Sequence, residues 1–201
     1  MNRRAMTRPL PALLACLVAL SACSPSGEAA PRPPLEGARI GGDFTLVDKA
    51  GKPVHFHDFA GKYRVVSFGY TFCPDVCPLD VQRLMQGYAK FAQAEPEVAA
   101  RVQPIFVTID PARDGPKEVG EFAAAFSPRL LGLTGSDAQV AAAAKMFAAY
   151  YARGEPRADG GYLMDHSRIA YLMDPQGKPL AMLPVDKDAA AVAAELARWT
   201  N

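Results

Sequence analysis

The stretch that decides the fold is Tyr70-Thr71-Phe72-Cys73-Pro74-Asp75-Val76-Cys77-Pro78, which continues the apolar run of residues 65–70. A residue before proline is disfavoured in the α region, so Cys73 and Cys77 are predicted to be extended or in a turn. Pro78 suits the first position of a helix, where its missing N–H costs nothing. The sequence therefore predicts a buried strand, a short loop that carries two thiols, and a helix that begins at Pro78.

The predicted helix is expected to favour the thiolate form of the two cysteines. Its positive N-terminal end is expected to point at the sulfur atoms and to lower the thiol pKa values. Two thiolates in one loop can close to a disulfide or bind a soft metal ion. A structural disulfide or a pair of buried core cysteines is the alternative. The position favours a functional site, because sites collect where a strand ends and a helix begins in α/β folds.

The first residues are typical of an export signal and are set apart from the fold. Three arginines at positions 3, 4 and 8 precede an almost wholly apolar run, residues 10–20. That run is shorter than the roughly 20 apolar residues that span a bilayer. It ends in Leu20-Ser21-Ala22-Cys23, which resembles a bacterial lipobox. We expect residues 1–22 to be a lipoprotein signal peptide and Cys23 to be lipidated, the alternative being an ordinary secretory signal.

The segment that follows, residues 23–38, is rich in Pro, Gly, Ala and Ser, and we expect it to be a flexible tether. The folded domain is predicted to occupy residues 39–201. Of the 4 cysteines in the chain, Cys16 leaves with the signal, so Cys73 and Cys77 are the thiols of the domain. With 22 basic and 21 acidic side chains and no basic stripe, the chain shows no sign of a nucleic-acid partner.

The remaining elements follow from periodicity and turn residues. In chain order they are a β-hairpin (44–47 and 54–56), a strand (64–70), a helix (79–94), a strand (102–109), a helix (116–126), a strand (130–133), a helix (136–151), a mobile loop (152–164), a second hairpin (169–173 and 180–185) and a helix (188–199). Crossover helices on a largely parallel sheet, closed by an antiparallel hairpin, predict an α/β, thioredoxin-like fold with an added N-terminal β-hairpin.

A histidine completes a candidate metal site. His166 lies just before the strand at 169–173, where this fold would bring it opposite Cys73 and Cys77. Cu(I) accepts two thiolates and one imidazole readily, whereas Zn(II) normally takes a fourth ligand. Asp165 is placed to orient the imidazole. The alternative for His166 is a capping or surface histidine.

Other polar residues have two interpretations each. Asp110 and Asp114 follow the parallel strand at 102–109, where they would tune the thiols, dock a partner or cap a turn. His55 and His57 lie two apart on a predicted strand and share a face. We interpret that pair as the solvated side of an edge strand rather than as a metal site.

Together these segments resemble the Sco/SenC family of copper-binding assembly proteins for cytochrome c oxidase. The matching segments are residues 69–78, Thr108-Ile109-Asp110-Pro111-Ala112-Arg113-Asp114, Asp165-His166-Ser167 and Tyr171-Leu172-Met173-Asp174-Pro175. The resemblance implies copper, as Cu(I) or Cu(II), bound by Cys73, Cys77 and His166 and handed to the copper-bearing subunit of the oxidase. Supporting roles fall to Asp75, Asp110, Asp114 and Asp165.

Three functions remain open at this point. The first is a copper chaperone without turnover, and the second is a thiol–disulfide oxidoreductase that reduces the partner's cysteines before metal enters. The third is a peroxidase, which Thr71 beside Cys73 suggests. Three residues separate the two cysteines, one more than in a typical oxidoreductase, and this wider loop suits a metal better.

The predicted export signal indicates the location, and the resemblance implies the partners. We expect a bacterial protein that a lipid holds on the periplasmic side of the cell membrane, among other periplasmic copper or thiol-redox proteins. Ser24 after the lipidated cysteine points to the outer membrane, whereas an oxidase partner points to the inner one, and we follow the partner.

Overall fold

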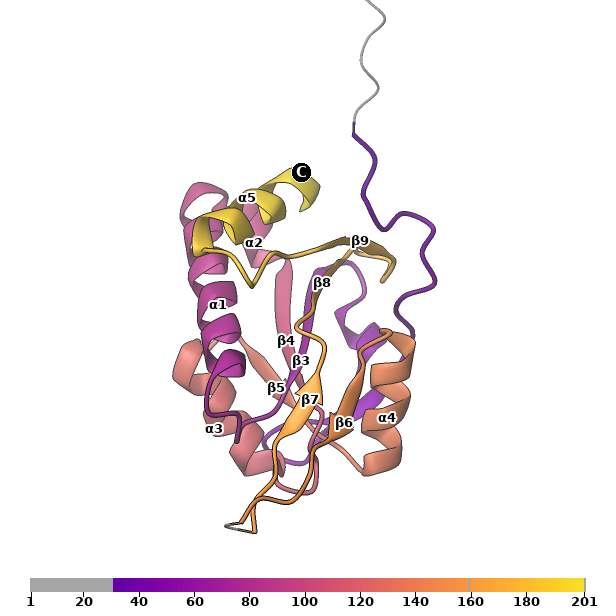
Figure 1. Ribbon diagram of the computed structural model, residues 1–201. Coiled ribbons are helices and arrows are strands. Elements are labelled where there is room, and N and C mark those ends of the chain that lie inside the picture. Colours follow the sequence, from indigo (N-terminus) through magenta and orange to yellow (C-terminus); the bar gives the residue numbers. More distant parts are fainter. Residues whose placement is uncertain (1–30, 159, 201) are drawn as a thin grey trace, which may run out of the picture. The chain divides into compact units, whose positions relative to one another are not determined.

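The computed structural model describes residues 31–158 and 160–200, and a five-stranded sheet lies at the centre of the folded unit (Figure 1). The strand order is β5-β4-β3-β8-β9. Its strands are β3 (Tyr63–Gly69), β4 (Val102–Thr108), β5 (Leu131–Leu133), β8 (Ala170–Met173) and β9 (Pro179–Met182). β3, β4 and β5 are parallel, and β8 and β9 form an antiparallel hairpin at one side. The thioredoxin-like α/β fold predicted from the sequence is confirmed.

Helices and a small hairpin cover the two faces of this sheet. One face carries α1 (Val76–Ala94), α3 (Pro116–Phe126) and α5 (Ala189–Thr200), with the short α2 (Pro96–Ala100) after α1. Figure 1 shows α1 and α5 side by side, and Gly87 permits this approach, because a Cβ there would lie 2.5 Å from Val192. The other face carries α4 (Asp137–Met146) and the predicted N-terminal hairpin, β1 (Thr45–Val47) with β2 (Pro53–His55), followed by the 3-10 turn η1 (Phe56–Phe59).

The central strands separate two hydrophobic cores, one on each face of the sheet. Along β3, Val65 packs into the core under α1 and α5, whereas Val66 and Phe68 pack into the core with Phe147 on the other face. Successive strand residues point to opposite faces, so a strand covered on both sides needs a continuous apolar run. The two apolar runs of the sequence therefore become β3 and β4, and the thiol loop leaves the carboxyl end of β3.

The structure differs from the sequence predictions at two places near the candidate site. Helix α1 begins at Val76, so Cys77 lies in the first helical turn rather than in the loop. Pro78 still fits, since the first-turn N–H groups have no helical partner. The predicted mobile loop at 152–164 includes parts of an antiparallel pair, β6 (Tyr151–Arg153) with β7 (Met164–His166). His166 is therefore a strand residue.

Two helix predictions also change. Helix α4 begins as predicted after Ser136, whose hydroxyl accepts a hydrogen bond from the Gln139 N–H, but it ends at Met146 instead of residue 151. The chain leaves the helix through Ala148, which has φ +48°, and then enters β6. Helix α2 was not predicted, because its five residues are too few to show a helical period.

The structure tests the predictions for the N-terminal segments only in part. The signal peptide at 1–22 and the lipidation site Cys23 lie outside the described residues. Within the predicted tether, the Leu35 N–H already bonds to the Leu180 carbonyl at 3.0 Å, and the Leu35 side chain packs on the core. Contacts with the domain thus begin before residue 39. No helix among residues 31–158 and 160–200 is long and apolar enough to cross a membrane.

Candidate metal site

A buried aspartate fixes the start of the thiol loop. The carboxylate of Asp114 accepts the Thr71 N–H at 2.9 Å and the Thr71 and Thr108 hydroxyls at 2.6 Å each. Asp114 is fully buried, so these three bonds replace its contact with water. The loop is thereby tied to the end of β4. The Thr71 hydroxyl donates its hydrogen to Asp114 rather than to Cys73.

Gly69 ends β3 beside the Phe106 ring and the first turn of α1. A Cβ at Gly69 would lie 2.9 Å from the Phe106 ring and 3.7 Å from the Cys77 Cβ. Glycine therefore leaves room for the Phe106 ring of β4, whereas the distance to Cys77 is an ordinary van der Waals contact. The first turn of α1 packs beside this position, and the Cys77 side chain lies in the interior, where it is 3% exposed.

The two thiols have opposite environments, which corrects the prediction that the helix end lowers both pKa values. Both cysteines are free, and the Cys77 N–H donates to the Cys73 Sγ at 3.4 Å. Burial raises the pKa of the Cys77 thiol far above its usual range, and its hydrogen bond with Cys73 raises it further. Burial also opposes ionisation of Cys73, but hydrogen bonds from Cys77 and the loop backbone outweigh it and lower the Cys73 pKa. Cys73 is the more accessible and more easily ionised thiol.

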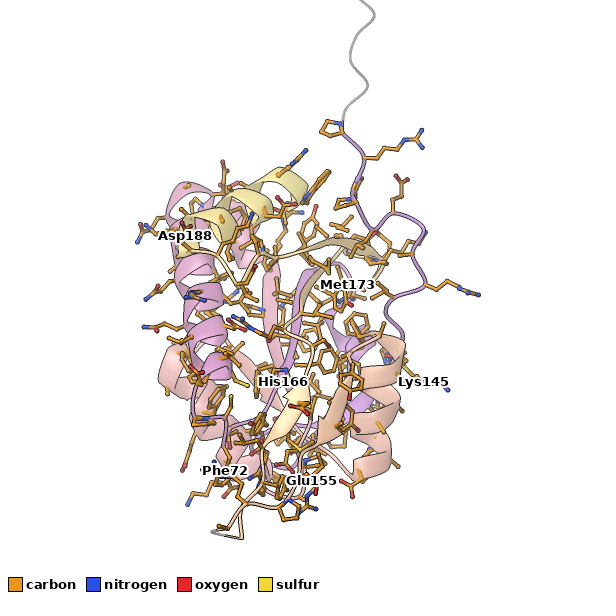
Figure 2. The ribbon with its side chains drawn as sticks, viewed as in Figure 1. Phe72, Lys145, Glu155, His166, Met173 and Asp188 are labelled. Atoms are coloured by element: carbon orange, nitrogen blue, oxygen red, sulfur yellow. The ribbon has the colours of Figure 1, made fainter. Side chains whose placement is uncertain are left out.

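His166 contacts Cys77 directly. Its Nε2 lies 3.0 Å from the Cys77 Sγ, and its Nδ1 lies 3.0 Å from the Ser167 carbonyl oxygen. A carbonyl oxygen only accepts, so Nδ1 carries the proton, and Nε2 presents its lone pair to the Cys77 sulfur. The Tyr70 ring packs edge-on against the imidazole at 5.9 Å. Figure 2 shows His166 on the β6–β7 hairpin, facing the sheet and α1.

The predicted ligands are neighbours but do not yet surround one point. Among residues 31–158 and 160–200, no three His, Cys, Asp or Glu side chains are arranged as a ready metal cluster. Cys77 and His166 are in contact, and Cys73 bonds to the Cys77 backbone. The Cys73 and Cys77 thiols also share a hydrogen bond, and the half-buried Cys73 is the more accessible of the two sulfur donors. Two sulfurs and one imidazole nitrogen are the donors that Cu(I) prefers, and the same two thiols can form a disulfide.

The four acidic residues assigned supporting roles separate into two kinds. Asp110 and Asp114 are buried, and their carboxylates hold neighbouring loops through hydrogen bonds to Tyr162 and Thr71. This favours a structural role for the pair. Asp75 precedes α1 and is exposed, and its side chain makes no capping hydrogen bond. Asp165 is exposed on β7, and the carbonyl of Ser167, not Asp165, orients the imidazole.

An ion pair beside the site was missed at the sequence level. Arg168 donates to both carboxylate oxygens of Asp80, at 2.7 and 2.5 Å. A small cavity of about 20 Å³ is lined by Asp80, Arg168, Cys77 and His166 among others. The pair joins the first turns of α1 to the segment after His166. Residues 88 positions apart give no sequence signal for such a contact.

The other two histidines stay outside this site. His55 ends β2 and His57 lies in η1, so the two do not share a strand as predicted. Their rings nevertheless stack, with centroids 5.1 Å apart, and His57 bonds to Asp43 at 2.7 Å.

Fold and site together define a class: a thioredoxin-like domain with a dithiol at the end of its first central strand and an imidazole opposite. The SCO1/SenC family model matches residues 32–201, so this chain belongs to the SCO1/SenC family. The mouse protein SCO2 homolog, mitochondrial, is 43% identical over 144 residues, which cover 71% of this chain and 56% of that protein. The chain spans about half the length of the curated relatives it matches.

Solved structures of similar proteins support membership of this family. Arabidopsis thaliana ScoI with copper bound has a TM-score of 0.73 and 33% identity, and the match covers 78% of this chain and 95% of that one. BsSco, described with a disulfide switch and as a member of the Sco family of cytochrome c oxidase assembly proteins, has a TM-score of 0.57 and 25% identity, with coverage of 74% and 89%.

Proposed function

We propose that this chain is a copper chaperone that binds copper through Cys73, Cys77 and His166 and delivers it to the dinuclear copper site of cytochrome c oxidase. The observation that carries the proposal is the contact between the Cys77 thiol and the His166 Nε2, with the Cys73 sulfur beside them. The donor set suits Cu(I). Family membership and the copper-bound relative from Arabidopsis support copper, and BsSco supports the oxidase as the partner.

The residues fit a metal that must be released again. Cys73 lies half-buried at the surface, and three donors leave copper with fewer ligands than a closed structural site. A partner protein can therefore bind the metal through its own thiol or imidazole before these three donor side chains release it. The buried Cys77 and the fixed His166 keep the site in place during that exchange.

A second candidate function, thiol–disulfide exchange with a partner protein, is supported by the contrasting environments of the two thiols. The lowered pKa of the accessible Cys73 and the raised pKa of the buried Cys77 are the pattern of an attacking and a resolving thiol. In that role the Cys73 thiolate attacks a partner disulfide, and Cys77 then displaces the reduced partner and forms the Cys73–Cys77 disulfide. The partner gains two electrons that this dithiol loses. Such a step would prepare oxidase cysteines for copper.

Replacing His166 by alanine separates the two functions. We expect Cu(I) to remain bound, but more weakly, because two thiolates stay. Cu(II) favours nitrogen donors, and its affinity should fall by more than the roughly 10- to 100-fold typical of losing an outer-shell partner. The reduction potential of the dithiol should change little, since exchange depends on the thiols. The measurements are the sulfur-to-Cu(II) charge-transfer bands, the dithiol potential, and oxidase activity in cells at low copper.

The matched control is His57→Ala, which removes an exposed histidine remote from the thiols. It should leave all three measurements at their wild-type values. Normal Cu(II) bands and normal oxidase activity in His166→Ala would exclude the imidazole as a ligand and leave the oxidoreductase function as the better account.

We further propose that a lipid on Cys23 holds the domain on the periplasmic side of the cell membrane. The apolar run at residues 10–20 is too short to span a bilayer, and a cysteine follows it at the expected distance. Cys23→Ala should therefore shift the protein from the membrane fraction to an unprocessed or soluble form. Mass spectrometry of the N-terminal peptide measures the modification. A mature, unacylated N-terminus together with unchanged membrane association would contradict the anchor.

A further inference from the structure

We propose that Arg113 is a positioning residue that holds the His166-bearing hairpin against the thiol loop, so that the imidazole is already in place when metal arrives. The inference rests on the proposed copper function and concerns residues outside the ligand set. Arg113 follows β4 in the loop that also carries Asp110 and Asp114.

The guanidinium of Arg113 touches three separate segments. Its Nε donates to the carboxylate of Asp110, and its Nη1 donates to the Tyr162 carbonyl at 2.9 Å. Its charged carbon lies 3.6 Å from the centroid of the Tyr162 ring and 5.1 Å from that of Phe72 in the thiol loop. It also lies 5.6 Å from the Tyr70 ring, which packs against His166. One side chain thus joins the end of β4, the thiol loop and the hairpin.

The contact at Tyr162 fixes the hairpin from its loop side. Tyr162 precedes β7, and its hydroxyl donates to the second carboxylate oxygen of Asp110 at 2.8 Å. The same tyrosine is therefore held by its carbonyl, its ring and its hydroxyl. Asp110 is 4% exposed, so the anchor for both partners is part of the buried framework. Figure 2 shows Phe72 of the thiol loop and Glu155 of the hairpin loop at the same end of the domain.

The hairpin needs this anchor because its backbone is not part of the main sheet. Within the part of the chain that the structure describes, strands β6 and β7 pair only with each other, in a two-stranded sheet. The end of the hairpin after His166 is held by β8, which begins at Ala170 and pairs with β3, and by the Arg168–Asp80 ion pair. The Ser167 N–H bonds to the Tyr150 carbonyl across the base of the hairpin, and side-chain contacts hold its loop side. Arg113 supplies such contacts on the side where the hairpin meets the thiol loop.

The Nη2 group of Arg113 is buried without a hydrogen-bond partner. The neighbouring aromatic rings take the place of a polar partner for this part of the cation. Lysine would keep the positive charge but could not bond to Asp110 and the Tyr162 carbonyl at once while stacking on the rings. Arg113→Lys is therefore the variant that tests geometry apart from charge.

The first test compares metal affinities of the full chain loaded with Cu(II) or Cu(I). Arg113→Lys should weaken Cu(II), which depends on the imidazole, by about 10-fold, the lower end of the range for outer-shell partners. Cu(I), held mainly by two thiolates, should change by less than about threefold. Tyr162→Phe keeps the ring and loses one hydrogen bond, and it should weaken Cu(II) by about two- to fivefold. Equal weakening of Cu(I) and Cu(II), or wild-type affinities in both variants, would overturn the proposal.

The matched control is Arg153→Lys. Arg153 also stacks on the Tyr162 ring, at 3.6 Å, but among the described residues it has no cation–π contact with the thiol-loop rings that Arg113 contacts. It should leave both copper affinities within about twofold of wild type, which fits a contact at an exposed site. An effect of Arg153→Lys as large as that of Arg113→Lys would show that stacking on Tyr162, rather than the bridge through Arg113, matters.

The second test uses the metal-free, reduced protein. Arg113→Lys should weaken the nuclear Overhauser contact between the Tyr70 and His166 rings and speed amide exchange in β6 and β7. Exchange in the five-stranded sheet should be unchanged. A wild-type protein that binds no copper would refute the proposed function, yet this metal-free result would still decide the positioning role. Unchanged ring contacts and unchanged hairpin exchange in Arg113→Lys would refute the positioning role alone.

Discussion

Replacing either thiol by alanine is expected to abolish tight copper binding. Wild-type domain, reduced and loaded anaerobically, should retain about one copper per chain against a chelator, because two thiolates supply most of the preference for Cu(I). In Cys73→Ala or Cys77→Ala, one thiolate and one imidazole remain, and the retained copper should fall to background. Metal analysis after chelator treatment and gel filtration measures the ratio.

The two variants also control for each other. Cys77 is 3% exposed and packs in the core, so its alanine variant loses some stability along with the ligand. Cys73 is half-buried in the loop, and Cys73→Ala should unfold close to the wild-type temperature while losing the same copper. Stoichiometric, chelator-resistant copper in either folded variant would remove that thiol from the site.

Replacing Asp114 by alanine is expected to have the largest effect on stability. Three donors lose their acceptor at once, two threonine hydroxyls and the Thr71 N–H, in a fully buried position. Hydrogen bonds to a charged group contribute roughly 1.5–3 kcal/mol each, and the hydroxyls can partly rearrange. We expect a loss of about 3–5 kcal/mol, which lowers the unfolding temperature by about 6–20 °C for a domain of this size.

Asp114→Asn is the matched control, because it keeps the shape and one acceptor oxygen. That oxygen can still receive the Thr71 N–H, while the amide nitrogen faces the Thr71 hydroxyl, which can turn and accept. The asparagine variant should lose no more than about half of the alanine effect. Chemical denaturation with a common slope measures both. Equal stability of wild type and Asp114→Ala would show that the loop does not depend on this anchor.

Much of the site was visible in the sequence because its signals are local. The run of residues 65–70 predicted a strand buried on both faces, and the thiols followed it directly. Pro78 marked the helix start within two residues. The Ser136 cap and the boundaries of α3 agree with the prediction because capping and first-turn proline act within a few residues. The fold class followed from the order of such elements.

The sequence by itself determined the fold class and the candidate residues Cys73, Cys77 and His166, since periodicity and turn chemistry act over short distances. Tertiary structure decided how those residues behave. Burial raises the pKa of Cys77, whereas hydrogen bonds from Cys77 and the loop backbone outweigh burial and lower the pKa of Cys73, although both thiols lie at the same helix end. The Asp80–Arg168 pair, and the bridge from Arg113 to the hairpin, join residues far apart in the chain. Such contacts leave no local pattern, because they exist only once the sheet has brought the segments together.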